Sequence, residues 1–356
     1  MSSSFDVAIA GAGLAGSCAA LTLSRTRRVV VLEPEAEPAT RASGAAAGLA
    51  NPLMGRRPRL AWRIDEALDA LRTVLREAGA EKLLRENGIV RPAVTGRHAA
   101  AFREAAEEHP DRTAWIDENE LAERHPAVRA DGGGALLVRR GGAVDVPAMT
   151  RALLAKAEVR GATVRFGAHL TNWRETPGGG VRISVNGAET LEAEHLVLAP
   201  GAGFSAFPAL DLDLEKIKGQ TIRVRAPVGL DAGSLPFLSG SGYVVPDGDA
   251  LVLGSTYERD FDDLAPSPDQ SDYILQKTSR MLPALAEADV VEARAGVRVK
   301  VPNSRYPLLD RLARRVWYFG ALGSKGLLTA PLLARGLPRF LGEPAALPRE
   351  VTLGRD

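Results

Sequence analysis

Residues 5–23, FDVAIAGAGLAGSCAALTL, place three glycines between an apolar run and a run rich in alanine and leucine. Gly11, Gly13 and Gly16 have the spacing GxGxxG, which predicts a strand, a tight turn and a helix in that order. In such a joint the first glycine permits the turn, the second lets a pyrophosphate approach the backbone, and the third lets helix and strand pack closely. The unpaired N–H groups at the start of the helix would then bind the phosphates.

An acidic residue follows at the spacing that a dinucleotide site requires. The apolar run RRVVVLEP contains Glu33, 17 residues after Gly16. A carboxylate at the end of a second strand accepts hydrogen bonds from ribose hydroxyls, and it would repel the 2′-phosphate of NADP. Strand, glycine spacing and acid together favour a dinucleotide-binding fold over a glycine turn that binds nothing. They leave FAD and NAD as alternatives.

Composition narrows the classes of protein. The 356 residues suffice for one large domain or two of ordinary size. A formal net charge of +1 gives no general basic field for nucleic acid or a membrane surface, although a local basic patch is compatible with it. The single cysteine, Cys18, excludes an intramolecular disulfide and a multi-cysteine metal site, and we expect it to be a packing residue.

Targeting and metal-binding signals are lacking. The five histidines show no metal spacing, so no metal is expected. No apolar run approaches the ~18 residues that span a bilayer, and the N-terminus has no charged leader or cleavage site. We therefore expect a cytoplasmic protein without a membrane partner.

A loop of small residues follows the second strand. Residues 41–55, RASGAAAGLANPLMG, are non-periodic, whereas a nicotinamide dehydrogenase would continue here into regular βαβ repeats. Alanine and glycine let backbone amides face a ligand closely, which suits the ribityl chain and ring of a flavin. The alternative is a plain surface loop, which would carry more charge.

Two further glycine turns follow apolar strands. HLVLAPGAG, residues 195–203, is typical of a strand that lies beside the first one and closes over a dinucleotide. GALGSKGLLTAPLLARGL, residues 320–337, predicts another strand, turn and helix close to the end of the chain.

These segments resemble the D-amino-acid oxidase, glycine oxidase and sarcosine oxidase superfamily of FAD enzymes. Within it, the chain is most similar to the C-terminal oxidase domain of MnmC, which modifies the wobble uridine of tRNA. The segments that carry the resemblance are RASGAAAGLANPLMG, VPAMTRALLAKAEVRGATVRF, SGYVVP with LVLGSTYERD, EARAGVRVKVPNSRYPLLD and WYFGALGSKGLLTAPLLA. The last three are the most specific.

The resemblance implies an α/β fold (α+β overall), with a Rossmann-like FAD-binding domain and a discontinuous substrate domain built on an antiparallel sheet. Both chain ends would contribute to the cofactor domain. We predict that residues 1–55, 140–205 and 295–356 form the FAD-binding domain, and that residues 56–139 and 206–294 form the substrate-binding domain.

The resemblance also implies which residues bind FAD. They are Gly11, Gly13, Leu14, Ala15, Gly16, Glu33, Arg41, Ala42, Ser43, Gly44, Leu49, Asn51, Leu170, Ala199, Gly201, Gly323, Ser324, Lys325, Gly326 and Leu327. The FAD would be non-covalent with respect to cysteine, because Cys18 is the only thiol and lies outside the catalytic half. The helix N-terminus after Gly323 and the side chain of Lys325 would stabilise negative charge on the reduced flavin; a solvated lysine is the alternative.

Two further residues carry the predicted catalysis together with Lys325. Arg298, in AGVRVKVP, matches the family arginine that grips a substrate carboxylate with a bidentate fork, a task for which lysine is unsuited. The family usually has proline directly after this arginine, whereas Val299 follows here and Pro302 comes later. Tyr243, in SGYVVP, matches a tyrosine that reaches the substrate amine or carboxylate. The alternatives are a surface arginine and a packing tyrosine.

The implied reaction is the oxidation of a C–N bond, with the flavin as hydride acceptor, hydrolysis of the imine, and release of glyoxylate. Positioning would supply most of the catalysis, since no histidine has a catalytic partner. The first candidate substrate is 5-carboxymethylaminomethyl-uridine in tRNA; the alternative is a free amino acid such as glycine, sarcosine, a D-amino acid or an opine-like secondary amine. Dioxygen or another acceptor would reoxidise the flavin. A flavin-binding protein without redox activity is a third hypothesis, against which the intact glycine turns argue.

One basic segment bears on tRNA as a partner. In MGRRPRLAWR, Arg56, Arg57, Arg59 and Arg63 would contact phosphates and Trp62 would stack on a base. The alternative is an exposed lead-in to a helix. The near-neutral charge, and the absence of a segment resembling the methyltransferase domain of MnmC, argue for a separate partner or a smaller substrate.

Overall fold

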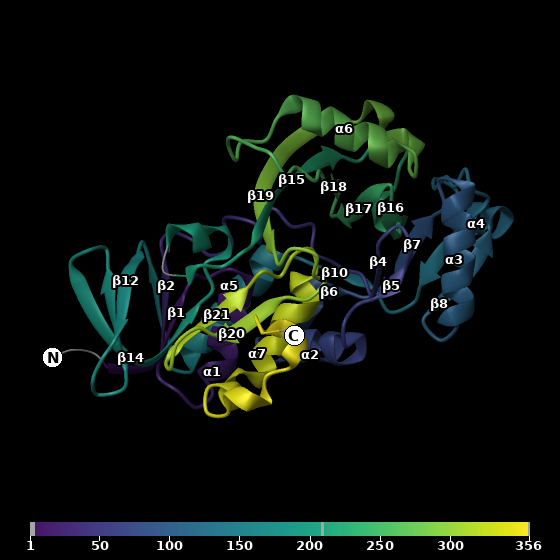
Figure 1. Ribbon diagram of the computed structural model, residues 1–356. Helices are drawn as coiled ribbons and strands as arrows, with labels where there is room; N and C mark the ends of the chain where they lie inside the picture. Colours follow the sequence, from purple (N-terminus) through teal and green to yellow (C-terminus); the bar gives the residue numbers. More distant parts are fainter. Residues whose placement is uncertain (1–3, 208–209, 355–356) are drawn as a thin grey trace.

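The computed structural model describes residues 4–207 and 210–354, most of which lie in or around two eight-stranded sheets (Figure 1). The first sheet comprises β1 (Ser4–Ala10), β2 (Val29–Glu33), β11 (Thr163–Phe166), β12 (Leu170–Glu175), β13 (Val181–Val185), β14 (Glu189–Leu198), β20 (Leu308–Arg311) and β21 (Val316–Gly320). The second comprises β7 (Ile89–Pro92), β8 (Thr113–Asp117), β9 (Gly134–Val138), β15 (Glu215–Arg225), β16 (Phe237–Gly240), β17 (Gly242–Asp247), β18 (Ala250–Gly254) and β19 (Val290–Lys300).

The described part of the chain also contains short strands and seven α-helices. The short strands are β3 (Leu49–Ala50), β6 (Leu84–Arg85) and β10 (Gly142–Val144) in one sheet, and β4 (Leu53–Met54) with β5 (Arg59–Leu60) in a hairpin. The α-helices are α1 (Leu14–Leu23), α2 (Ile64–Glu77), α3 (Gly96–Glu108), α4 (Glu118–Arg124), α5 (Val146–Val159), α6 (Pro268–Ser279) and α7 (Gly326–Phe340).

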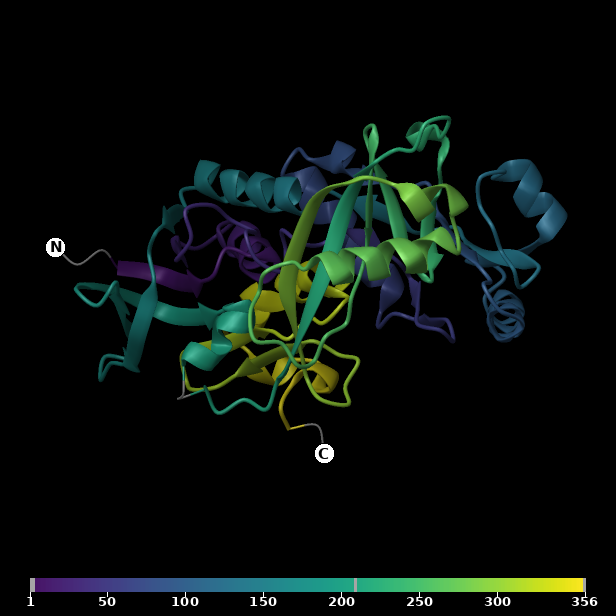
Figure 2. The same ribbon diagram turned by 90° about the horizontal axis from the view of Figure 1, so that it is seen from above.

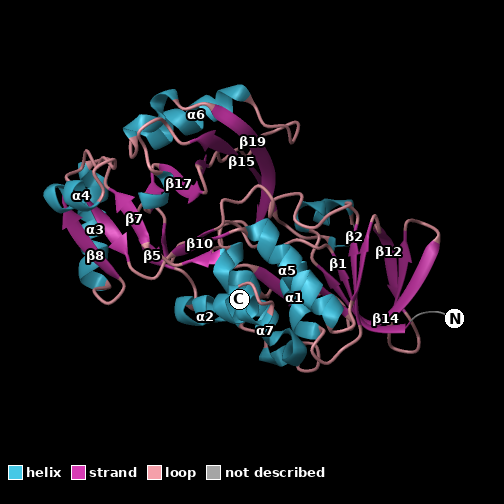
Figure 3. Cartoon of the chain, turned by 180° about the vertical axis from the view of Figure 1, so that it is seen from behind, coloured by secondary structure: helices cyan, strands magenta, loops and turns pink. Residues whose placement is uncertain are grey.

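The first sheet is parallel at its centre, as in a Rossmann-like domain. β1 pairs in parallel with β2 and β14, and β14 pairs in parallel with β21. The strands are continuous apolar runs because both faces are covered. Along β1, Val7 and Ile9 belong to a core shared with α1, α2, α5 and α7, whereas Ala8 and Ala10 belong to the core on the opposite face. Figure 3 shows the helical layer from behind. The predicted fold class is confirmed.

The two ends of the chain meet in this sheet. In the register of the ladder Ala10 lies beside Leu198, and Leu198 lies beside Tyr318. The parallel strands β1 and β21 therefore end at the same edge, and the glycine turn that follows each one starts there. Helices α1 and α7 pack against each other along the same face. A Cβ atom on Gly326 would lie 3.3 Å from Cδ2 of Leu14, so the starts of the two helices are neighbours.

The second sheet is antiparallel except where β16 pairs with β7. Its longest ladder joins β15 to β19, which have 11 residues each and run from the first sheet to the far edge of the molecule. Helix α6 covers the outer face of this sheet, where Ile222, Leu253 and Ile274 share a core (Figure 2). The inner face carries the alternate residues, many of which are polar.

Two segments, α2 and β19, suggest other domain boundaries than the predicted ones. Helix α2 falls in the range assigned to the substrate domain, but its apolar face, including Leu68 and Leu71, packs into the core shared with α1 and α7. The sequence shows that α2 is amphipathic but cannot show which core receives its apolar face. β19 crosses the boundary at residue 295 and lies in the second sheet along its whole length. We propose a division that assigns residues 61–80 to the cofactor domain and residues 290–300 to the substrate sheet.

Two absences hold for residues 4–207 and 210–354. None of the helices in these ranges combines the length and the apolar composition that crossing a bilayer requires. The same residues contain no group of three or more histidine, cysteine, aspartate or glutamate side chains arranged to hold a metal ion.

The buried His195 of β14 predicts a pH dependence of stability. It is 3% exposed, its Nε2 lies 3.0 Å from Nη1 of Arg315, and burial lowers its pKa to about 4 from 6.5. Between these pH values the unfolded chain binds a proton that the folded chain does not, so the free energy of unfolding falls as the pH falls from 6.5 to 4, by roughly 3 kcal/mol. His195→Gln removes this contribution, and urea denaturation at a series of pH values measures it. The exposed His169→Gln serves as the control and keeps the wild-type slope; equal slopes for all three proteins would contradict the assignment.

Candidate functional site

A loop from the cofactor domain crosses the inner face of the second sheet. At one end a Cβ atom on Gly296 of β19 would lie 2.7 Å from Cα of Ala42. In the middle the Thr221 hydroxyl donates to the carbonyl of Ala45 at 3.1 Å, and at the other end Asn51 Nδ2 donates to the Ser239 hydroxyl of β16 at 3.2 Å. Residues 42–51 therefore run from β19 to β16 and divide the inner face into two parts.

Arg298 lies on the part of this face nearest the first sheet. Its guanidinium crosses Gly219 of β15, where a Cβ atom would lie 2.4 Å from Nη2, and Nη2 donates to the carbonyl of Thr256 at 2.7 Å. Its Cζ lies 5.5 Å from the ring centroid of Tyr257, and burial lowers its pKa. Among the described residues, no carboxylate forms an ion pair with Arg298. A half-buried guanidinium without a counter-ion is the arrangement that a carboxylate ligand would complete.

Tyr243 lies over the strand next to it in the sheet. A Cβ atom on Gly254 of β18 would lie 2.4 Å from the Tyr243 hydroxyl. Burial raises the pKa of Tyr243, and the nearby charge of Arg298 and the hydroxyl of Ser255 act in the opposite direction. The hydroxyl is therefore protonated at neutral pH, and it lies in the same neighbourhood as Arg298.

Sequence reasoning missed several residues of this neighbourhood. Lys277 of α6 donates to the Ser255 carbonyl at 2.9 Å, one residue before the carbonyl that Arg298 binds. Gly219 and Gly254 leave the space that the Arg298 and Tyr243 side chains occupy. A glycine inside a strand is the one available signal, because it marks a close approach by another group. Nothing in the local sequence connects Lys277 to the site.

The first glycine turn has the geometry of a phosphate-binding joint. Gly11 has φ +106°, and a Cβ atom there would lie 2.4 Å from the carbonyl oxygen of Ala199. A Cβ atom on Gly16 would lie 1.8 Å from the carbonyl oxygen of Gly11, so the helix can approach the turn only with glycine at that position. The Leu14 N–H donates to the Ser43 hydroxyl at 3.1 Å, which brings the 42–51 loop to the start of α1.

Glu33 is buried where β2 ends. It is 7% exposed, and its carboxylate accepts from the N–H of Ala12 at 2.6 Å and from the N–H of Glu35 at 3.1 Å. Burial raises its pKa, although both hydrogen bonds act in the opposite direction. Each carboxylate oxygen retains a lone pair, so the group can also accept from a ribose hydroxyl beside the glycine turn.

The second glycine turn lies against the end of the strand that carries Arg298. The Gly323 N–H donates to the carbonyl of Val299 at 2.8 Å, and the backbones of Lys300 and Leu322 form an isolated antiparallel β-bridge. Lys325 is half-buried at the start of α7, and burial together with the charge of Arg305 lowers its pKa. The turn before α7 therefore lies against Val299, the residue that follows Arg298 in β19. Within the described residues, the Lys325 ammonium forms no hydrogen bond with Arg298.

The remaining predicted cofactor residues differ in whether their side chains already have polar partners within the chain. Leu49, Ala199 and Gly201 lie along the loop or at the end of β14, and Leu170 is buried at the start of β12. Arg41 and Asn51 have partners within the chain instead. Arg41 forms an ion pair with Glu35, and Asn51 Oδ1 accepts from the N–H of Leu53 at 3.0 Å.

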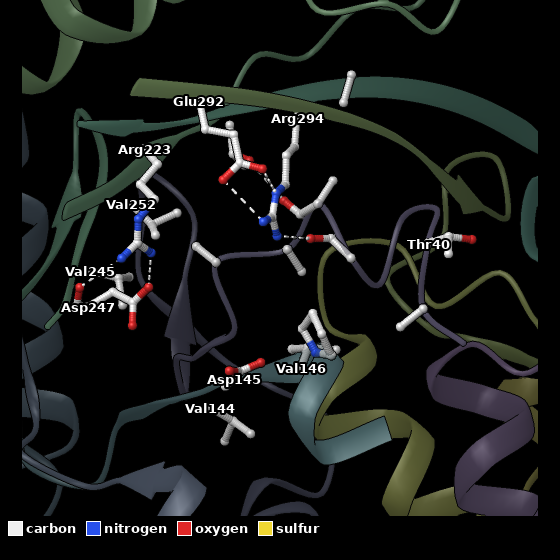
Figure 4. Close-up of a pocket in the computed structure, with 18 of the residues that line it drawn as sticks. Thr40, Val144, Asp145, Val146, Arg223, Val245, Asp247, Val252, Glu292 and Arg294 are labelled. Carbon is white, nitrogen blue, oxygen red and sulfur yellow. Dashed lines mark hydrogen bonds and ion pairs between the residues drawn. The ribbon is translucent and has the colours of Figure 1, made fainter. Parts of the chain in front are cut away.

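A cavity of about 880 Å³ lies on the other side of the 42–51 loop (Figure 4). Four of the charged side chains that line it form two ion pairs, Arg223 with Asp247 and Arg294 with Glu292. None of the three predicted catalytic residues is among the residues that line it. We therefore assign the candidate site to the opposite side of the loop, where Arg298 is unpaired.

These residues fit FAD. The glycine turns at 11–16 and 323–326 start at one sheet edge, and Glu33 offers a buried carboxylate at the end of the neighbouring strand. The alanine and glycine residues at 42–48 place backbone rather than side chains between the turns and the second sheet. The one thiol, Cys18, is fully buried inside α1.

Comparison with known proteins agrees with this geometry. The model of the DAO family, described as FAD dependent oxidoreductase, matches residues 6–337. Glycine oxidase of Geobacillus kaustophilus is 27% identical, over 99% of this chain and 98% of that protein. The bifunctional protein MnmC of Polaromonas naphthalenivorans, named for tRNA 5-methylaminomethyl-2-thiouridine biosynthesis, is 30% identical over 94% of this chain, which spans only 56% of that protein. The crystal structure of the Geobacillus glycine oxidase superimposes with a TM-score of 0.83 at 24% identity, covering 96% of this chain and 95% of that one.

The space above Gly219 provides a test of the Arg298 position. In Gly219→Ala the new methyl group would displace the guanidinium while touching only the end of a flexible side chain. We expect a loss of kcat/KM for a carboxylate-bearing amine on the order of a hundredfold, because misplacing a binding group by about 1 Å has effects of that size. The melting temperature should change little. Gly178→Ala, in an open turn, is the matched control. Unchanged kinetics in Gly219→Ala would show that Arg298 does not act from this position.

Proposed function

Since the chain belongs to the DAO family of FAD-dependent oxidoreductases, enzymes that act on CH–NH groups with FAD as cofactor, we propose that it oxidises the C–N bond of a glycine-type amine, R–NH–CH₂–COO⁻. The observation that carries the proposal is Arg298, which has no carboxylate partner among the described residues. Tyr243 lies in the same neighbourhood, and the turn before α7 is hydrogen-bonded to Val299, the next residue of the same strand. An arginine fork binds a carboxylate in a fixed orientation, so the adjacent CH₂ group would be held in one position.

FAD, when bound, supplies a two-electron hydride acceptor. Loss of a hydride and a proton from the CH₂–NH unit gives an imine, and addition of water then releases glyoxylate and the amine R–NH₂. Arg298 would hold the carboxylate throughout, and the Tyr243 hydroxyl would donate to the carboxylate or accept from the amine. Lys325 and the N-terminus of α7 would supply positive charge beside the cofactor. Dioxygen or another acceptor would take up the electrons.

Two kinds of substrate are candidates, a modified nucleoside of tRNA and a free amino acid, and a different observation favours each. The MnmC relatives and the exposed arginines of the β4–β5 hairpin favour 5-carboxymethylaminomethyl-uridine in tRNA, with a cytoplasmic location. The glycine oxidase relative, which this chain matches over almost its whole length, favours free glycine or sarcosine. Trp62 contacts Tyr306 edge to face and lies 3.4 Å from Glu350, so the hairpin rather than this ring is the better candidate for RNA contact.

A substrate comparison tests the choice of amine. Purified holoenzyme is incubated in parallel with hypomodified tRNA, glycine and sarcosine, and nucleosides and glyoxylate are quantified by mass spectrometry. We expect conversion of the carboxymethylaminomethyl nucleoside to the aminomethyl nucleoside with equimolar glyoxylate. Oxidation of glycine or sarcosine without conversion of tRNA would establish the second candidate, and glyoxylate from none of them would contradict the proposed reaction.

Replacing Arg298 tests its predicted role in binding. Arg298→Ala should weaken transition-state binding of a carboxylate substrate by roughly 2–5 kcal/mol, as is typical when one partner of a desolvated charge pair is removed. Arg298→Lys should recover only part of this, because lysine cannot form the bidentate fork. Arg223→Gln is the matched control, since Arg223 lies in the same sheet but lines the cavity beyond the loop. Steady-state kinetics decide the question, and wild-type kcat and KM in Arg298→Ala would show that another group holds the carboxylate.

A further inference from the structure

Lys277 reaches the candidate site from an unexpected direction. Helix α6 lies on the outer face of the second sheet, whereas Arg298 lies on the inner face. The lysine side chain passes the start of β17, where a Cβ atom on Gly242 would lie 3.3 Å from Cε of Lys277. Its ammonium then donates to the Ser255 carbonyl at 2.9 Å, beyond the end of β18. Gly242, the residue before Tyr243, thus leaves the space through which a lysine of the outer helix reaches the backbone carbonyl next to the one that Arg298 binds.

Lys277 and Arg298 bind consecutive carbonyl groups. Arg298 donates to Thr256 at 2.7 Å, and Lys277 donates to the preceding residue. Burial lowers the pKa of Lys277, and the charges of Arg298 and of Arg56 lower it further. The two cations, one from β19 and one from α6, therefore act on each other within a chain whose formal net charge is only +1.

No carboxylate of the described chain balances this cluster. Within residues 4–207 and 210–354, neither Lys277 nor Arg298 forms an ion pair, whereas the half-buried Arg72, Arg160, Arg165 and Arg223 all do. Holding cations together without counter-ions is unfavourable, and it is relieved when a ligand brings negative charge. A glycine-type carboxylate on Arg298 supplies a single negative charge. It leaves Lys277, which contacts the Ser255 carbonyl and lies 5.3 Å from the ring centroid of Tyr273, without a negatively charged partner among the described residues.

We propose that Lys277 forms a second anion-binding position beside Arg298, and that the preferred substrate therefore carries a negative group in addition to its glycine-type carboxylate. This inference rests on the proposed function for the identity of the first carboxylate. The second group is a phosphate in a nucleotide substrate or a second carboxylate in a small secondary amine. Glycine and sarcosine have neither.

Calorimetric binding to the holoenzyme tests the inference without requiring turnover. One arm compares iminodiacetate with sarcosine, and the other compares 5-carboxymethylaminomethyl-uridine with its 3′-monophosphate. We expect the dianionic member of at least one pair to bind about 10-fold or more tightly than the other member. Preference in the first arm identifies a carboxylate as the second group, and preference in the second arm identifies a phosphate.

Variants attribute the preference to Lys277. Lys277→Gln should abolish the preference while changing the Kd of sarcosine or the nucleoside less than 3-fold, and Lys277→Arg should retain it. Lys156→Gln, on α5 of the cofactor domain, is the matched control for loss of one positive charge. Equal affinities within both pairs, or an equal effect of Lys277→Gln on mono- and dianions, would overturn the inference.

Kinetics separate this inference from the proposed function. Where the substrates turn over, the effect of Lys277→Gln should appear in KM for the dianion, with kcat within 3-fold of wild type. A dianion preference that depends on Lys277, without glyoxylate release from any substrate, would remove the proposed function and leave the second anion position. Glyoxylate release without a dianion preference would remove the second anion position and leave the proposed function.

Discussion

The parallel pairing of β14 with β1 on one side and β21 on the other is the constraint on which the site depends. Because Ala10, Leu198 and Tyr318 lie side by side, two strands more than three hundred residues apart end at the same sheet edge. The glycine turn after each strand then opens a helix at that edge, so that α1 and α7 start together and pack along their length. Two helix N-termini directed to one place provide partial positive charge for an anionic dinucleotide.

The 42–51 loop transmits this arrangement to the second sheet. It is tied to α1 through Ser43, to β15 through Ala45 and to β16 through Asn51. Its small side chains allow backbone to lie directly on strands, most closely at Gly296. The loop also separates two electrostatic environments on the same sheet face. On one side Arg223 and Arg294 are paired with acids, and on the other no carboxylate of the described residues pairs with Arg298.

Arg298 and Lys277 have no acidic partner among the described residues, and the proposed function assigns this part of the protein to a ligand. Arg91 provides a contrast, because it is buried at 3% exposure, also without an acid, yet it donates to the carbonyls of Leu53, Gly55 and Ser239 and lies over the ring of Phe102. Its donors are used within the fold, where they hold the base of the β4–β5 hairpin. Arg298 and Lys277 each donate to one carbonyl and lie near one tyrosine ring, so that further N–H groups of each can bind an anion.

The sequence by itself determined the cofactor-binding turns, because the GxGxxG spacing, the acid at residue 33 and the apolar strands are local patterns with a local physical cause. The same is true of the amphipathic character of α2, whereas Arg298 was singled out by the resemblance to the family of FAD enzymes. Only the tertiary structure decided which core receives α2 and which side of the loop carries the site. It also decided that Lys277, on a helix of the outer face, binds the carbonyl next to the one that Arg298 binds. These features depend on contacts between residues far apart in the chain, and neither periodicity nor spacing encodes which distant surface a side chain will meet.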